Sequence, residues 1–487
     1  MKNSDSAEVS PYPEGKALPI AVTGSERDDR RALLGRALLA VGASRLLAAC
    51  GGGASASVAS AASPPAPPPA PPPAPPIILP DWVPAAGELT VMTRANGRLA
   101  NSFVSQCAPY YAPFFFAKIV NDYSCSFLNP YFGANGAIFF FGGGHAATND
   151  NSVCALILGQ QRCEFRRMID PSPIFGRSSD EATRMANSRT SAGSFIDPVY
   201  AEYKVDGQPA APHSYSSGDF LGPSEGGAAQ GSFLRVLNTA VGVIGVAGAE
   251  AAHQVDFADQ VGPYRWRRVT DNVGLHSGPG SNPAKLAPAN WTAWVASQDR
   301  VYTDSRAGGS GRPPTWFDRG TLRWVTGTGA LRLNDAEQGA VSGAMFHVPE
   351  RELLIFCDCK AGRLRIQTLD TSQAQPSWQA GVVLSQPVLL QPEFGSACWC
   401  SHNGRILVGE LFADDASIAE IQIPARLTDP WAVARAPFGN GQRIRWATNA
   451  SYKKWSYNPR IRAVVYMPSA DPGGLADEVF VYRPRGT

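Results

Sequence analysis

One short unit, a polar turn followed by a run of apolar residues, recurs along the chain from Ile77 onward. Its clearest copy is Ala137–Phe141, which follows an Asn-Gly turn and precedes three glycines. A short apolar run bounded by glycine and asparagine predicts a strand buried on both faces, because glycine costs a helix interior about 1 kcal/mol relative to alanine. The other copies lie at residues 233–237, 291–295, 348–356, 402–408 and 457–466.

The spacing of these units predicts a ring of small sheets. The later copies follow one another at steps of roughly 50 to 60 residues, within the range of a four-stranded propeller blade. The 48 glycines, 41 prolines and 17% charged residues suit many short strands joined by tight turns. We therefore predict an all-β fold over residues 81–487, a six-bladed β-propeller, with seven blades as the alternative. We expect the strand at 478–482 to share a blade with one near 89–92, which would close the ring.

Aromatic residues recur near the end of each unit, where a large ring can cover the contact with the next blade. Together with Gly142–Gly144 after a buried strand, this pattern resembles the kelch-type β-propeller family, which includes the galactose-oxidase-like copper radical oxidases. That oxidase pattern needs a Tyr-His pair late in the chain, whereas this sequence has no Tyr-His dipeptide and no histidine after His402. The resemblance therefore implies the fold and not the oxidase reaction. The aromatic stretches are residues 165–168, 264–269, 316–318, 377–378 and 430–431.

The first 50 residues have the pattern of an export segment. A mostly apolar run follows Arg30 and Arg31 and ends at Leu-Ala-Ala-Cys50. The paired arginines resemble a twin-arginine signal, and the ending resembles a lipobox, where a bacterial lipoprotein is cut before a lipid-modified cysteine. The resemblance implies a lipid on Cys50 and an exported lipoprotein anchored to a membrane of the bacterial envelope, facing the periplasm or the surface. The alternative is an amphipathic helix over 32–49 in a soluble protein.

Residues 51–80 predict a spacer between this signal and the propeller. The segment is rich in Gly, Ala and Ser and then in Pro. Proline runs favour polyproline II, at about 3.1 Å per residue, and cannot bury a core. A second long segment, Pro173–Pro212, has little apolar periodicity and many Ser, Arg and Asp residues. It is a candidate lid or rim of a binding site, with a disordered insertion as the alternative.

Eight cysteines follow Cys50, and an even number in an exported protein favours disulfides. Cys154 and Cys163 flank one short loop, and Cys107 and Cys125 flank another, so we expect local pairing in each. The second four form two Cys-x-Cys strands, in which residues two apart share a face. Cross-strand disulfides are the first expectation, with free buried thiols or a four-thiolate zinc site as alternatives. These four are Cys357, Cys359, Cys398 and Cys400.

Candidate site residues gather at glycine turns and at the expected starts of strands. If these strand ends share one face of the ring, imidazoles converge near its axis. The alternative for each histidine is a hydrogen bond that ties a loop. The catalytic candidates are His145, His213 and Tyr215, and the binding candidates are His145, Asn149, Asp150, Asn151 and His276.

Other chemistry finds less support in the sequence. There is neither a G-x-S-x-G nucleophile elbow nor a phosphate-cradling G-x-x-x-x-G-K, and the six histidines lack H-x-x-x-H spacing. We therefore expect no metal and no cofactor. Carboxylates such as Asp150, Asp219, Asp256 and Asp318 could serve a glycosidase or lyase if they lie together in space. A net charge of +2 argues against a nucleic-acid partner.

The function that the sequence favours is binding. We expect an envelope-tethered propeller that holds a polysaccharide or an envelope protein on one face of the ring, because that face collects loops from every blade. The first alternative is a glycan-active lyase or hydrolase with its site at the propeller mouth, near His145, Asn151, His213 and Tyr215. The second is a structural component of the envelope.

Overall fold

The structure is a computed structural model of the 487-residue chain. The chain divides into two compact units, Met1–Pro75 and Pro76–Thr487. All the described residues belong to the second unit, so the export signal, Cys50 and nearly all of the spacer lie outside them. The described ranges are 78–107, 126–141, 151–171, 188–189, 203–204, 208–209, 218–236, 253–269, 290–305, 314–327, 343–358, 362–390, 396–446, 452–468 and 477–486.

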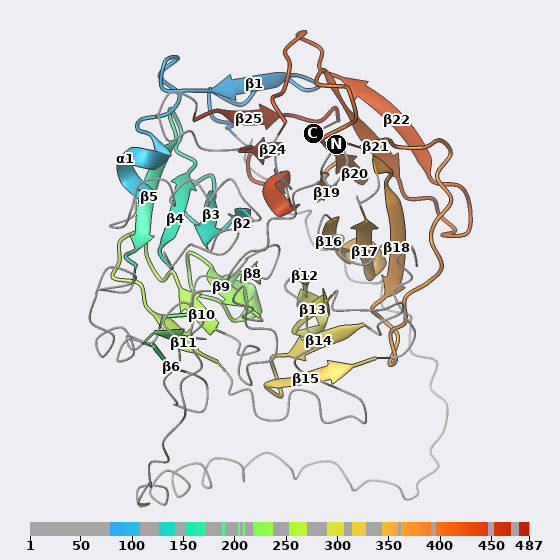
Figure 1. The fold of residues 1–487 in the computed structure, drawn as a ribbon, viewed down its shortest axis with the longest axis horizontal. Coiled ribbons are helices and arrows are strands. Elements are labelled where there is room, and N and C mark those ends of the chain that lie inside the picture. The colour runs from blue at the N-terminus through green and yellow to red at the C-terminus, as the bar shows by residue number, and fades with distance from the viewer. Residues whose placement is uncertain are drawn as a thin grey trace, which may run out of the picture. The chain divides into compact units, whose positions relative to one another are not determined.

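Six small antiparallel sheets are arranged in a ring and form a six-bladed β-propeller (Figure 1). The prediction of six blades is confirmed, and each of the six apolar units found in the sequence falls in a different blade. Blades are numbered here in the chain order of their inner strands. Blade 1 contains β2 (Ser126–Asn129), β3 (Ala137–Phe141), β4 (Val153–Ile157) and β5 (Glu164–Ile169). Blade 2 contains β8 (Gly218–Leu221), β9 (Ser232–Arg235), β10 (His253–Asp256) and β11 (Trp266–Arg268).

The remaining blades follow the same meander, in which the first strand lies innermost. Blade 3 contains β12 (Asn290–Val295), β13 (Arg300–Ser305), β14 (Thr315–Asp318) and β15 (Arg323–Thr326). Blade 4 has three regular strands, β16 (Gly343–Val348), β17 (Leu353–Asp358) and β18 (Arg365–Asp370). Blade 5 contains β19 (Ala397–Cys400), β20 (Arg405–Val408), β21 (Ser417–Gln422) and β22 (Ala432–Pro437). Blade 6 contains β23 (Ser456–Asn458), β24 (Ala463–Tyr466), β25 (Val479–Tyr482) and, from the other end of the chain, β1 (Leu89–Met92).

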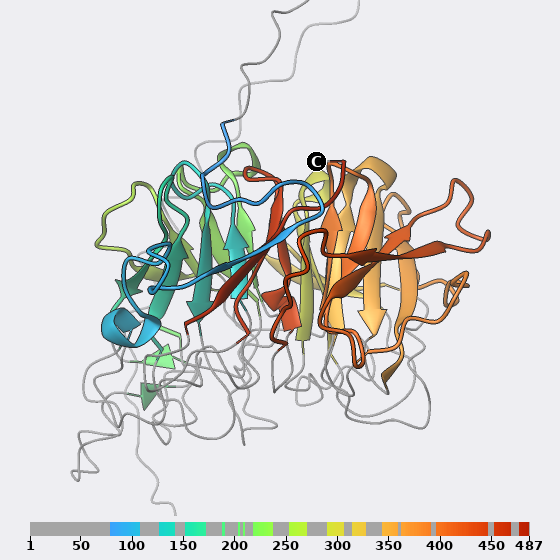
Figure 2. The same ribbon diagram turned by 90° about the horizontal axis from the view of Figure 1, so that it is seen from above.

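The inner strands close the ring by contacting one another in turn. The order is β2, β8, β12, β16, β19 and β23, and β23 contacts β2 again. Figure 2 shows the strands of the blades standing side by side around this centre. Blade 6 is completed by β1, which pairs with β25 so that Leu89 lies opposite Tyr482 and Met92 opposite Val479. This closure is the one predicted from the sequence.

Each blade is packed between two others, and this explains the unbroken apolar runs. Side chains alternate across a strand, so Phe139 and Phe141 of β3 pack against blade 2, while Ile138 and Phe140 pack against blade 6. Six buried clusters fill the six contacts between neighbouring blades. The aromatic residues expected near the outer strands belong to these clusters. They include Phe165, Trp266, Trp316, Trp378 and Trp431.

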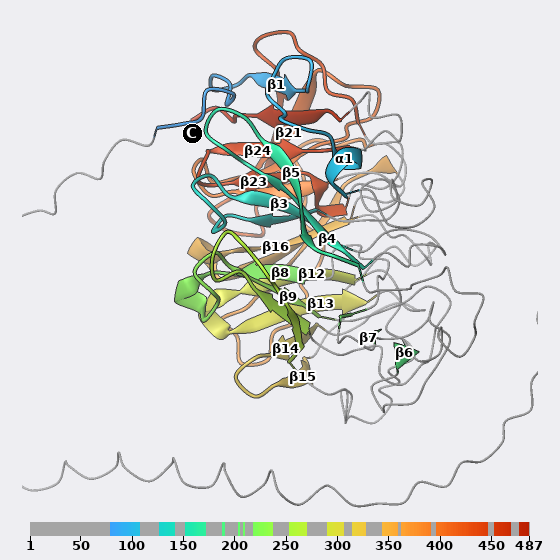
Figure 3. The ribbon, with the colours of Figure 1, turned by 90° about the vertical axis from the view of Figure 1, so that its left-hand side faces the viewer.

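The elements outside the blades are short. Helix α1 (Phe103–Cys107) packs beside β5 (Figure 3), and β6 (Ser188–Arg189) pairs with β7 (Tyr203–Lys204) inside the segment expected to form a lid or rim. Most of that segment lies outside the described residues. The 3-10 turns are η2 (Pro223–Glu225), η4 (Ala296–Gln298), η5 (Pro349–Arg351) and η7 (Tyr452–Lys454). None of the helices in the described ranges has the length and hydropathy needed to cross a membrane.

The disulfide expectation is wrong for the cysteines that can be judged. Cys154 and Cys163 are both buried thiols. The register of β4 and β5 places Cys154 opposite Arg167 and Ile157 opposite Glu164. Cys163 therefore lies beyond Glu164, four positions along the ladder from Arg167, or about 13 Å at 3.3 Å per residue. A disulfide needs two Cα atoms within about 7 Å.

In the second cysteine group, Cys398 and Cys400 also lack the expected cross-strand disulfides. Cys398 and Cys400 are buried thiols on β19 and face the core between blades 5 and 6. Cys357 belongs to the core between blades 4 and 5, on the other side of blade 5. The two sets are therefore turned toward different blade contacts. Cys125 and Cys359 lie outside the described residues.

Candidate functional site at the start face

The six inner strands all begin at the same face of the ring, here called the start face. Hydrogen bonds between a side chain and the backbone join neighbouring inner strands here: Thr292 Oγ1 donates to the Gly218 carbonyl at 3.1 Å, and the Trp455 amide donates to Ser396 Oγ at 3.3 Å. The opposite face, here called the turn face, carries the tight turns that join each inner strand to the second strand of its blade. Those turns include η2, η4 and η5.

Most of the residues predicted from the sequence adjoin the start face along the chain but lie outside the described ranges. These are His145, Asn149, Asp150, His213, Tyr215 and His276. The nearest described strand ends along the chain are Phe141, Val153, Gly218 and Arg268, all at the start face. Asn151 is described and fully buried, and its side-chain amide donates to the Pro209 carbonyl at 3.1 Å. That bond ties the residues leading into β4 to the stretch that precedes β8.

The centre of the start face is crossed by η7, the 3-10 turn that precedes β23. It contacts β2 of blade 1 and β16 of blade 4, which lie opposite each other in the ring. Lys453 Nζ lies 3.2 Å from Asp219 Oδ2 and 3.4 Å from the Gly218 carbonyl of blade 2. Because these contacts reach beyond the neighbouring blade, η7 lies across the axis as a floor beneath the mouth of the ring.

Hydrogen bonds from several blades hold this floor in place. The Lys453 carbonyl accepts bonds from Ser456 Oγ at 2.6 Å and from Ser126 Oγ at 3.4 Å. The Asp219 carboxylate also accepts the Trp294 amide at 3.0 Å. The Lys453 and Asp219 side chains are 16% and 30% exposed, so the ion pair still meets solvent.

An aromatic and acidic group lies beside η7 on blades 5 and 6. Trp446 is partly exposed, its indole donates to the Asp414 carbonyl at 2.8 Å, and its ring meets those of Trp455 and Tyr466 edge to face. The Tyr466 hydroxyl donates to Glu410 Oε1 at 2.9 Å, and both residues are buried. The start face thus presents one partly exposed indole, held by buried aromatic rings, as well as the Lys453–Asp219 ion pair. Ligand sites commonly combine an aromatic ring with charged groups.

Sequence reasoning did not single out Lys453, Trp446 or Glu410. The available signal was the pair Lys453-Lys454 shortly before the inner strand β23, because the start of an inner strand lies near the axis. Asp219 was named only as one of several carboxylates. The turn that brings Asp219 and Lys453 together depends on contacts between distant blades, which strand periodicity does not encode.

The other described carboxylates considered for a hydrolase do not join Asp219. Asp256 and Asp318 lie toward the turn face. Burial tends to raise the pKa of Asp256, but hydrogen bonds from Ser232 and Gln254, together with Arg267, hold it below its usual value. A paired-carboxylate hydrolase needs two carboxylates that face one site, whereas Asp256 is held by Ser232 and Gln254, Asp318 by Arg300 and Thr321, and Asp219 by Lys453.

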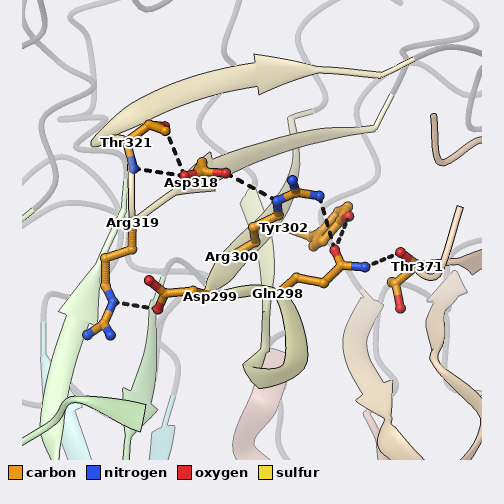
Figure 4. A network of polar contacts seen from close by, with 8 residues as sticks. All are labelled: Gln298, Asp299, Arg300, Tyr302, Asp318, Arg319, Thr321 and Thr371. Carbon is orange, nitrogen blue, oxygen red and sulfur yellow. Dashed lines mark hydrogen bonds and ion pairs between the residues drawn. The ribbon is translucent and has the colours of Figure 1, made fainter. Parts of the chain in front are cut away.

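The turn face is held together by a polar network around blade 3 (Figure 4). Arg319 Nε donates to Asp299 Oδ1 at 2.7 Å, and Arg300 Nε donates to Asp318 Oδ2 at 3.3 Å. Burial tends to raise the pKa of Asp318, but bonds from Thr321 and Arg300 outweigh it and leave the pKa lowered. The hydrogen-bond donors and acceptors of these side chains are paired with one another. The network therefore joins the turns and leaves few free donors or acceptors for a ligand.

The two described histidines with resolved pKa shifts also lie toward the turn face. Partial burial and the nearby Arg462 lower the pKa of His402, whose Nδ1 is 2.7 Å from Tyr457 Oη. Burial raises the pKa of Tyr457, so its hydroxyl stays protonated and shares a hydrogen bond with the His402 ring. Within the described ranges, no three His, Cys, Asp or Glu side chains are grouped as they would be to hold a metal.

Comparisons with known proteins found distant similarities to solved structures. No protein-family model matches the chain, and no curated protein matches it in sequence. The crystal structure of the allergen Mala s 1 of Malassezia sympodialis is 10% identical, with 75% of this chain and 94% of that chain covered and a TM-score of 0.40. An auxiliary nutrient binding protein from Bacteroides ovatus is 8% identical, with 81% and 76% covered and a TM-score of 0.37.

TolB from Acinetobacter baumannii is 10% identical, with 74% of this chain and 63% of that chain covered and a TM-score of 0.29. The assignment as a six-bladed propeller stands on the sheet order and ring closure of this chain itself. The kelch resemblance stays a prediction.

Proposed function

We propose that this protein is an envelope-tethered propeller that binds a polysaccharide or an envelope protein through its start face. The observation that carries the proposal is that η7 reaches from blade 6 across the axis and fixes Lys453 against Asp219 of blade 2. Groups held in this way suit recognition, because they are positioned before the partner arrives.

Trp446 gives this mouth a specific recognition surface. Its indole N–H is already bonded to the Asp414 carbonyl, so the ring orientation is set without a ligand. A fixed aromatic face can pack against the apolar face of a sugar ring or against a side chain of a protein partner. We therefore expect Trp446 to contribute more to binding than any other partly exposed tryptophan among the described residues.

Retention on immobilised polysaccharides and on an envelope protein fraction tests this function. The wild-type chain should be retained, and Trp446→Ala should lower retention at least tenfold. Trp399→Ala is the matched control, because Trp399 is a partly buried tryptophan that packs in the core between blades 4 and 5. Equal losses in the two variants, or a loss in Trp399→Ala alone, would count against Trp446 as the recognition surface.

The same incubation separates binding from catalysis. New chain ends in the polysaccharide, absent with His145→Ala, would replace the binding proposal with the glycan-active lyase or hydrolase. Retention without new chain ends supports binding. The anchor is tested separately by labelling cells with a fatty acid, which should mark the wild type and not Cys50→Ser. No label on the wild type would remove the tether from the proposal.

A further inference from the structure

The outer edge of blade 4 departs from the regular four-stranded plan. After β18, the chain returns along this strand and pairs with it at two separated places. Near one end, the Gln379 amide donates to the Thr368 carbonyl at 2.8 Å, and the Val382 amide donates to the Ile366 carbonyl at 2.9 Å. Near the other end, the Leu364 amide donates to the Val388 carbonyl at 3.0 Å.

Between these two places the returning segment is longer than the strand it faces. One β-bridge joins Leu369 to Trp378, and another joins Arg363 to Leu389. The two bridges are six residues apart along β18 and the residues before it (369 − 363), but eleven residues apart along the returning chain (389 − 378). The additional five residues (11 − 6) must leave the plane of the sheet. Blade 4 therefore has a bulge at its outer edge.

The bulge is not a loose loop, because blade 5 holds it. The Trp431 amide donates to the Val383 carbonyl at 2.8 Å, and the Ser385 amide donates to the Trp431 carbonyl at 2.9 Å. Ser385 Oγ accepts the Val433 amide at 2.9 Å. Residues 383–385 thus run parallel to the start of β22. They form a wall at the outer edge of blade 4 that hydrogen bonds to blade 5 hold in place.

A groove with a volume of about 380 Å³ lies between β18 and this wall. Its lining residues are 363–367 on one side and 381–387 on the other. Volumes of about 300 Å³ and more are typical of small-ligand sites. The backbone of β18 is paired at both ends of the groove, so recognition inside it depends on side chains.

Arg363 and Arg365 supply the charge of this groove. They are two residues apart on one extended segment, so their side chains share a face at a spacing of about 7 Å. Both are exposed, and within the described ranges neither has a carboxylate or a carbonyl partner. Two other exposed arginines do have such partners: Arg435 pairs with Asp414 and Arg443 with Asp415.

We propose that this groove binds an extended acidic peptide that presents two carboxylates at alternate positions. An extended peptide repeats its side chains on one face every two residues, with the same period of about 7 Å as the two arginines. Each guanidinium can hold one carboxylate through two parallel N–H donors. The site lies on the outer wall of blade 4 and is independent of the start face.

Fluorescence anisotropy with two labelled peptides on the full chain tests this site. The probe is Thr-Asp-Val-Asp-Thr, and the neutral comparison is Thr-Asn-Val-Asn-Thr. We expect the acidic peptide to bind at least tenfold more tightly, since each charge-assisted contact contributes more than a neutral one. A third peptide with adjacent aspartates should bind more weakly than the probe, because adjacent side chains point to opposite faces.

Variants assign the binding to the groove. The double variant Arg363→Gln, Arg365→Gln should weaken binding of the probe at least tenfold and leave the thermal midpoint unchanged, because both side chains are exposed. Arg443→Gln, which removes another exposed arginine, should change the affinity less than twofold, and so should Trp446→Ala. Equal affinity for the acidic and neutral peptides, or an unaffected double variant, overturns the proposal. Binding of polygalacturonate at the arginines without binding of the peptide also overturns it.

Discussion

Lys453 Nζ of blade 6 lies 3.2 Å from Asp219 Oδ2 of blade 2, although blade 1 separates the two blades in the ring. The contact is possible because η7 leaves the wall of the ring and crosses its axis. It links blades that share no sheet and no interblade core. The ion pair therefore contributes both to closing the mouth and to holding the ring together.

Replacing Lys453 should destabilise the fold moderately. Lys453→Met removes a partly buried charge and leaves the Asp219 carboxylate with one fewer donor, so we expect a loss of about 1–2 kcal/mol in the free energy of unfolding. Urea denaturation at pH 7 measures it. Arg426→Met is the matched control, because Arg426 is 81% exposed and pairs only with nearby Asp429. Its effect should stay within about 0.5 kcal/mol. Equal effects of the two substitutions would contradict the axial role of Lys453.

Closure of the ring through β1 should contribute strongly to stability. Leu89 is fully buried in the core between blades 5 and 6. Leu89→Ala should lower the free energy of unfolding by about 2–5 kcal/mol, through lost burial and the cavity left behind. Ile78→Ala serves as the control, because Ile78 is 81% exposed. If Leu89→Ala and Ile78→Ala unfold at the same urea concentration, β1 is not part of the cooperative ring.

Stability should fall as the pH drops below about 6.5. Burial lowers the pKa of His347, and this effect outweighs the opposing charges of Glu352 and Glu350. Below its unfolded pKa, near 6.5, the unfolded chain binds the proton more readily than the folded chain, so stability is complete above that pH and decreases as the pH falls. Urea midpoints measured from pH 7.5 to 5.0 should show the decrease.

His347→Gln should make this decrease smaller. It should not abolish it, because the pKa of His402 is lowered too. His402→Gln then tests the second contribution, and the double variant should show the flattest profile. A His347→Gln profile parallel to that of the wild type would show that His347 titrates alike in the folded and unfolded chains.

The described thiols should resist alkylation until the protein unfolds. Burial raises the pKa of Cys163 to about 12, so almost no thiolate forms near pH 8. Iodoacetamide should label Cys154 and Cys163 in urea without prior reduction and leave both unlabelled in the native protein. Mass spectrometry of tryptic peptides reads out both sites. A peptide pair linked through these two cysteines before reduction would disprove the thiol state.

The blades were predictable because each depends on local information. The unbroken apolar run of Ala137–Phe141 indicates a strand that is buried on both faces. The pairing of β1 with β25 could be expected because it removes free sheet edges. The regular spacing of such units was enough to indicate six blades. The disulfide expectation failed because cysteine counting ignores register, which places Cys154 opposite Arg167.

The sites were less predictable because they arise between blades. Lys453 meets Asp219 only after the whole ring has formed, and the groove beside Arg363 exists only because Trp431 of the next blade holds the bulge. Neither arrangement leaves a periodic trace in the sequence. Only Asn151 among the predicted site residues is described, and it is a buried contact to Pro209.

The two ends of the described chain meet at the turn face. The Gly87 amide donates to the Arg483 carbonyl at 2.7 Å, and Trp82 Nε1 donates to the carbonyl of Gly159 in a turn of that face. Figure 2 shows the blue start of the described chain and the C-terminus on the same side of the ring. A spacer or fusion partner joined directly before residue 78 or after residue 486 would therefore attach on the side away from the start face. Immobilising the propeller at either of these positions should leave its start face unobstructed, and a short peptide joining them would give a circular chain that could be reopened in another blade.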